Sequence, residues 1–279
     1  IAVLGPNADQ VQFGDYTWSR DNKDGITPLQ GIKALVGEKI KINHAVGCSM
    51  MSRDTTGIGE AVEATLKSDV AVIFCGCSSA SLARDYTRTN CGEGFDLSDL
   101  SLTGAQSDLI QAVYATGKPV ILVLVSGKPF AISWEKEHIP AIVAQWYGGE
   151  QEGYAIADVL FGKVNPSGHL TYSFPQSAGH YNHLPSDKGF YKRPGSYEQS
   201  GRDYVFSSPE PLWAFGHGLS YTTFSFDKME CDKNIYASGD TIEVKVQVRN
   251  TGQRTGKEVV QLYVRDLVSS VVTPVKQLK

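Results

Sequence analysis

The first two thirds of the chain alternate short apolar runs with helical patterns, and this alternation constrains the fold more than any other feature. Runs of this length, rich in Val and Ile and bounded by Gly or Pro, are typical of strands buried on both faces. Strands and helices in this order predict an α/β fold, a three-layer sandwich with a mostly parallel sheet. The predicted strands are residues 1–5, 41–46, 70–75, 120–125 and 141–146.

Between these runs lie four predicted helices, at residues 28–35, 59–66, 103–116 and 149–161. The pattern is clearest in the third, where Leu109, Ile110 and Val113 fall at helical spacing. Thr103 is the expected cap at its start, and the Gly-Lys-Pro sequence at 117–119 ends it. In the fourth, Glu150 and Glu152 lie at the N-terminal end, where negative charge interacts favourably with the helix dipole. This interaction explains both residues without a functional role.

The character of the sequence changes at about residue 177. Residues 177–221 are polar and aromatic without a sustained period, which predicts a long segment wrapped over a surface. In residues 222–279, alternating apolar and polar side chains at 241–249, turn residues at 250–253 and a further run at 258–264 predict an antiparallel sandwich. Such folds usually need about 100 residues, so this domain is expected to be incomplete. Residues 1–176 form the predicted α/β domain.

Composition excludes several classes of function. Lys and Arg number 26 against 30 Asp and Glu, a net charge of −4, which argues against a nucleic-acid partner. No apolar run approaches the ~20 residues that a membrane span needs. The five cysteines are odd in number and are expected to be buried free thiols, and the six histidines show no metal-ligand spacing. Both ends of the sequence are expected to be cut from a longer protein.

The segment from 83 to 102 contains the strongest candidates for chemistry. It lies between an apolar strand and an amphipathic helix, and the carboxyl ends of strands are where α/β proteins usually place their active sites. Glu93, which has Gly92 before it and Gly94 after it, is the main candidate. The four acidic residues of the segment are Asp85, Glu93, Asp96 and Asp99.

Motifs along nearly the whole chain, in one consistent order, point to a known family. They are IAVLGPNA at 1–8, GDY at 14–16, TPLQGI at 27–32, the acidic loop with the helix after it, GGE at 148–150, ADVLFG at 157–162, NPSG at 165–168 and FGHGLSYT at 215–222. Together they resemble the C-terminal portion of a family 3 glycoside hydrolase, the group of β-glucosidases and β-xylosidases.

The resemblance implies an α/β sandwich domain followed by a fibronectin type III-like domain, which belongs to the immunoglobulin-like class of sandwiches. It also implies an N-terminal (β/α)8 barrel domain, absent here, that carries the nucleophilic aspartate and most sugar-binding residues. The implied activity is retaining, exo-acting hydrolysis of β-linked oligosaccharides or glycosides, without a cofactor, by an enzyme that is secreted or periplasmic. Without the barrel, this chain alone is expected to be inactive.

Within the resemblance, Glu93 is the expected general acid/base. Many relatives read Glu, any residue, Glu, Gly, any residue, Asp, Arg in this loop, whereas Cys91 replaces the first glutamate here and Leu97 replaces the arginine. A thiol is not a comparable proton donor to a sugar oxygen, so the role falls to Glu93. Asp85 and Asp96 are its rivals, or neighbours whose charge helps to keep it protonated.

Other residues have two interpretations. Arg84 and Arg88 are candidate substrate-binding residues, although loop arginines more often form surface ion pairs. Asp15 and Tyr16 follow the first predicted strand, either near a domain interface or simply in a turn that enters a helix. The alternative function is a non-catalytic module that binds carbohydrate or docks a partner. Whether glucose or xylose is the sugar stays open.

Overall fold

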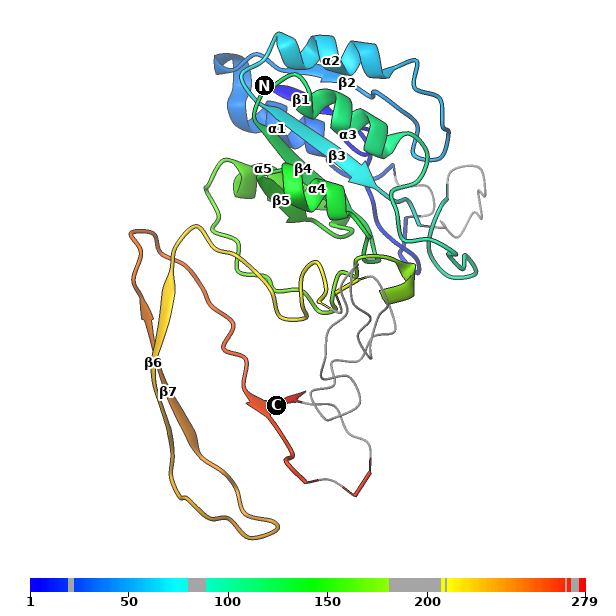
Figure 1. Cartoon of the computed structure of the whole chain (residues 1–279). Helices are drawn as coiled ribbons and strands as arrows, with labels where there is room; N and C mark the ends of the chain where they lie inside the picture. Colours follow the sequence, from blue (N-terminus) through cyan, green and yellow to red (C-terminus); the bar gives the residue numbers. More distant parts are fainter. Residues whose placement is uncertain (20–22, 80–88, 181–206, 209, 269, 272–275) are drawn as a thin grey trace.

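A computed structural model describes residues 1–19, 23–79, 89–180, 207–208, 210–268, 270–271 and 276–279. Its first part contains a five-stranded sheet in the order β2-β1-β3-β4-β5, in which all neighbouring strands are parallel (Figure 1). The predicted α/β class and parallel sheet are confirmed. The strands are β1 (Ala2–Leu4), β2 (Asn43–Ala45), β3 (Ala71–Gly76), β4 (Val120–Val125) and β5 (Ala141–Ala144).

Helices cover both faces of this sheet. Along β3, successive side chains alternate between two apolar clusters: Ile73 belongs to one, with residues of α2 and α3, and Phe74 to the other, with residues of α1 and α5. This alternation produces three layers, because neighbouring residues of a strand point to opposite faces. The helices are α1 (Pro28–Val36), α2 (Ile58–Leu66), α3 (Gln106–Tyr114), α4 (Ser133–His138) and α5 (Glu152–Leu160). The short 3-10 turns are η1 (Gly37–Lys39), η2 (Gly149–Gln151) and η3 (Ala178–His180).

Two details of the predicted helices are wrong. Helix α3 begins at Gln106 with Ala105 as its cap, rather than at Thr103. The Thr103 hydroxyl instead donates to the carbonyl oxygen of Met50 at 2.6 Å, so it is committed to a tertiary contact. Helix α4, which the sequence pattern did not predict, stacks the rings of Trp134 and His138 at 4.3 Å between their centroids.

A small antiparallel region follows, in which β6 (Phe224–Cys231) pairs with β7 (Val244–Asn250) and β8 (Tyr263–Val264) pairs with β9 (Gln277–Leu278). The strand expected at 241–249 is present as β7, and its partner in the sheet is β6. Of the five cysteines, four are buried free thiols as predicted, and Cys231 on β6 is exposed. Among the residues that the structure describes, no helix has the length and apolar character needed to cross a membrane.

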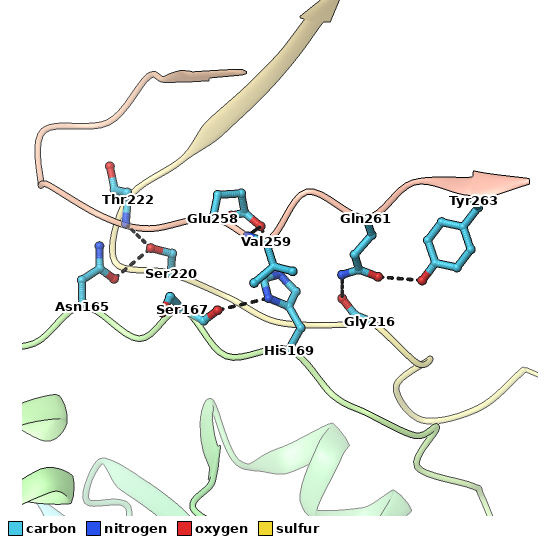
Figure 2. A network of polar contacts seen from close by, with 10 residues as sticks. All are labelled: Asn165, Ser167, His169, Gly216, Ser220, Thr222, Glu258, Val259, Gln261 and Tyr263. Atoms are coloured by element: carbon cyan, nitrogen blue, oxygen red, sulfur yellow. Dashed lines mark hydrogen bonds and ion pairs between the residues drawn. The ribbon is translucent and has the colours of Figure 1, made fainter. Parts of the chain in front are cut away.

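Polar contacts join the end of the α/β part to the segments that enter β6 and β8 (Figure 2). The side-chain oxygen of Asn165 accepts a hydrogen bond from the Ser220 hydroxyl at 2.8 Å. His169 Nε2 lies 3.1 Å from the Glu258 carboxylate, and both side chains are mostly buried. The Gln261 amide donates to a backbone carbonyl of the segment before Ser220. Three separate stretches of chain therefore meet at one polar junction.

The packing of α1 on α5 gives a first prediction. A Cβ atom on Gly31 of α1 would lie 2.0 Å from the carbonyl oxygen of Gly153 on α5, so the helices touch through backbone. We expect Gly31→Ala to lower the free energy of unfolding by about 1–3 kcal/mol through overpacking, measured by denaturant unfolding. Gly59→Ala is the matched control, because Gly59 lies on α2 with open space around it and should be neutral or slightly stabilising. Equal effects at both positions would contradict this account.

Candidate active-site loop

Connections from three strands meet at one edge of the sheet. All five strands are parallel, so their carboxyl ends share that edge. The connection after β3 contains Glu93, the one after β1 contains Asp15, and the one after β5 contains Tyr147. Two contacts bring them together: the backbone N–H of Glu93 donates to Asp15 Oδ2 at 3.0 Å, and Cys91 Sγ lies 2.8 Å from the Tyr147 hydroxyl.

We call residues 89–102 the Glu93 loop, and a buried polar clasp holds its base. The side-chain oxygen of Asn90 accepts the backbone N–H of Ser78 at 2.9 Å, and its amide nitrogen donates to the Thr103 hydroxyl at 2.8 Å. Nearby, the fully buried Gln106 exchanges two hydrogen bonds with the backbone of Gly76, at the end of β3. The base of the loop is therefore held next to the end of β3.

The tip of the Glu93 loop is a tight, exposed turn. Gly92 and Gly94 have φ angles of 111° and 81°, values that favour glycine, and the N–H of Phe95 returns to the Gly92 carbonyl at 3.2 Å. Glu93 and Asp96 are both exposed. The glycines on each side of Glu93 thus form the turn that places Glu93 at the exposed tip of the loop.

Beneath the tip, the buried Cys91 and Cys77 form a cluster with the partly buried Tyr147 and Lys128. A hydrogen bond between the two thiols raises the pKa of Cys91 and lowers that of Cys77. Burial raises the pKa of Tyr147 and lowers that of Lys128, whose buried ammonium lies 4.1 Å from the centre of the Phe130 ring. Cys91 is only 5% exposed, so its thiol is part of the foundation of the loop and does not share the surface with Glu93.

Glu152, interpreted from sequence as a helix-dipole residue, has a further structural role. It is 1% exposed, and its carboxylate accepts the backbone N–H groups of Gln12 at 2.9 Å and Gly148 at 3.2 Å. Gln145 donates to it as well. Burial outweighs these hydrogen bonds and raises the pKa of Glu152 from 4.5 to about 8. This carboxyl group joins the connection after β1 to the connection after β5.

The structure therefore brings Glu93 and Asp15 together and leaves Asp96 exposed nearby in the sequence. Asp85, Arg84 and Arg88 lie outside the described residues, and their expected roles stay predictions. The sequence analysis did not single out Asn90 or Lys128, which belong to the clasp and the buried cluster. Within the described ranges, no three His, Cys, Asp or Glu side chains are grouped as a metal site would need.

Residues 1–221 match the family model for the glycosyl hydrolase family 3 C-terminal domain. The chain belongs to glycoside hydrolase family 3. The resemblance drawn from the sequence motifs is thereby confirmed, and the match ends at residue 221, within the motif at 215–222.

Similarity to individual glycosidases supports the assignment to this family. A β-xylosidase of Formosa agariphila is 42% identical over the whole chain, and a periplasmic β-glucosidase of Salmonella typhimurium is 35% identical; the chain covers 38% of each. A solved β-glucosidase of Erythrobacter marinus is similar to the whole chain with a TM-score of 0.84 at 33% identity, and 38% of it is covered. The chain thus corresponds to less than half the length of these enzymes.

The raised pKa of Glu152 predicts a dependence of stability on pH. Because the folded state binds the proton more tightly, the free energy of unfolding falls as pH rises from 4.5 to about 8. A shift of this size corresponds to a loss on the order of several kcal/mol. We expect Glu152→Gln to flatten this part of the stability profile, measured by urea unfolding at several pH values.

Glu150→Gln is the control, because Glu150 is exposed two residues earlier on the same connection. In this variant, the free energy of unfolding should fall with rising pH as steeply as in the wild type. If Glu152→Gln shows the same fall, the buried carboxyl group of Glu152 is not the cause of the pH dependence.

Proposed function

We propose that this chain is the C-terminal, acid/base-bearing part of a retaining, exo-acting β-glycosidase that removes terminal non-reducing β-linked sugars. The observation that carries the proposal is the placement of Glu93. It is an exposed carboxyl at the tip of a glycine-bounded turn, on the carboxyl edge of the sheet, in a family whose relatives include β-xylosidases and β-glucosidases. Glucose and xylose both remain candidates for the sugar that is removed.

In the proposed mechanism, Glu93 works in two steps. It first donates its proton to the glycosidic oxygen while a second carboxylate attacks the anomeric carbon, and it then removes a proton from the water that hydrolyses the glycosyl-enzyme. Retaining enzymes place the two carboxyl groups about 5–5.5 Å apart. The second carboxylate belongs, in this proposal, to an N-terminal (β/α)8 barrel domain of the same enzyme. The exposure of Glu93 suits a group that must reach across to another domain.

The domain assignment is part of the same proposal. Residues 1–176 form the α/β domain, residues 177–221 connect it to the next, and residues 222–279 begin a fibronectin type III-like sandwich. The polar junction of Asn165, His169 and Glu258 supports a close attachment between the first and third parts. The named periplasmic relative supports a location outside the cytoplasm.

The first test replaces Glu93 by Gln in the full-length enzyme and compares aryl β-glycosides with good and poor leaving groups. Loss of general acid catalysis should lower kcat/KM, which reports the glycosylation step, by about 10²–10⁴ for a poor leaving group. It should lower kcat/KM much less for dinitrophenol, which leaves without a proton. Azide should restore turnover of the good substrate as a β-glycosyl azide, because this anion needs no general base.

Asp96→Asn is the matched control, because Asp96 is an exposed carboxyl in the same loop and the remaining described rival. If it shows the leaving-group dependence and azide rescue that Glu93→Gln lacks, the acid/base is Asp96. Wild-type rates for the Glu93 variant on every substrate would remove Glu93 from the mechanism.

A second test uses residues 1–279 alone with the same aryl glycosides. One acid/base carboxyl cannot carry out a double displacement, so no turnover above the uncatalysed background is expected. Product of retained configuration, detected by NMR from the chain alone, would mean that the nucleophile lies within these residues.

A further inference from the structure

We propose that Asp15 is a positioning residue for Glu93: its carboxylate fixes the backbone of the Glu93 loop so that the Glu93 carboxyl meets the glycosidic oxygen. This inference rests on the proposed function. The contact that carries it joins residues 78 positions apart in the sequence, because Asp15 Oδ2 accepts the N–H of Glu93 itself at 3.0 Å. A hydrogen bond to a charged acceptor is stronger than one between neutral groups.

Asp15 can serve as an anchor because its own segment is held firmly. Three residues before it, the backbone N–H of Gln12 donates to the buried Glu152 carboxylate, and the Gln12 carbonyl accepts the N–H of Gly149 at 3.1 Å.

Tyr147 links the same two segments a second time. Its ring packs against Gly14, next to Asp15, and its hydroxyl contacts the Cys91 thiol, two residues before Glu93. Beyond the contacts of Asn90 at its base, the Glu93 loop is therefore fixed by the Tyr147 hydroxyl at Cys91 and by Asp15 at its exposed tip. Loss of the Asp15 contact should leave the loop folded but free the tip.

A displacement of about 1 Å at a reacting group costs up to 10²-fold in rate. We therefore expect Asp15→Ala in the full-length enzyme to lower kcat/KM for a poor leaving group by about 10- to 100-fold. The kcat/KM of the dinitrophenyl glycoside should fall far less, because its leaving group needs no proton from Glu93 in the glycosylation step. The measurement is kcat and KM for both substrates.

Two further variants separate positioning from general damage. Asp15→Asn keeps an oxygen that accepts the Glu93 N–H, so it should restore most of the lost rate. Asp9→Ala removes a carboxylate from the same connection that accepts the Thr27 hydroxyl at 2.7 Å, and it should behave as wild type. Asp15→Ser, whose side chain is too short for the contact, takes the place of Asp15→Ala if the latter does not fold.

The inference is overturned if Asp15→Ala is as active as wild type or lowers kcat/KM equally for both substrates. It is also overturned if Asp15→Asn loses as much activity as Asp15→Ala. Parallel assays of Glu93→Gln separate this failure from failure of the proposed function. If Glu93→Gln has no effect, the proposed function fails. If Glu93→Gln impairs the poor substrate while Asp15→Ala does not, only the positioning role of Asp15 is rejected.

Discussion

The parallel arrangement of the five strands is the constraint on which the candidate site depends. It directs every carboxyl end to one edge of the sheet, so connections far apart in sequence leave the sheet as neighbours. The contact between Asp15 and Glu93 is a consequence of the adjacency of β1 and β3, and that between Cys91 and Tyr147 extends the arrangement to β5. Apolar clusters on both faces keep these strands in place.

Burial also explains which kind of side chain suits position 91. Cys91 is almost inaccessible to solvent and contacts the hydroxyl of Tyr147. A small thiol suits such surroundings, since it is polarisable and loses little on leaving water. The foundation of the loop and its exposed tip thus have separate requirements, which Cys91 and Glu93 meet respectively.

The sequence was most informative where one local signal dominated. The apolar runs predicted all five strands of the parallel sheet, and the glycine-bounded acid after β3 predicted the candidate loop. Helix α4 was missed because its six residues contain too few turns for an apolar period. The start of α3 was misplaced because Thr103 bonds to Met50. No local pattern can pair β7 with β6, or Asp15 with Glu93, since those contacts depend on the tertiary fold.

The bond between Asp15 and Glu93 uses the main chain of residue 93, not its side chain. Every amino acid except proline carries that N–H, so the place of the residue and its reactivity are encoded separately. A hydroxyl, imidazole or thiol introduced at position 93 would extend from the same fixed backbone position without a redesigned loop. Such independence allows a lineage, or an engineer, to exchange the reactive group in a single substitution while the surrounding architecture stays unchanged.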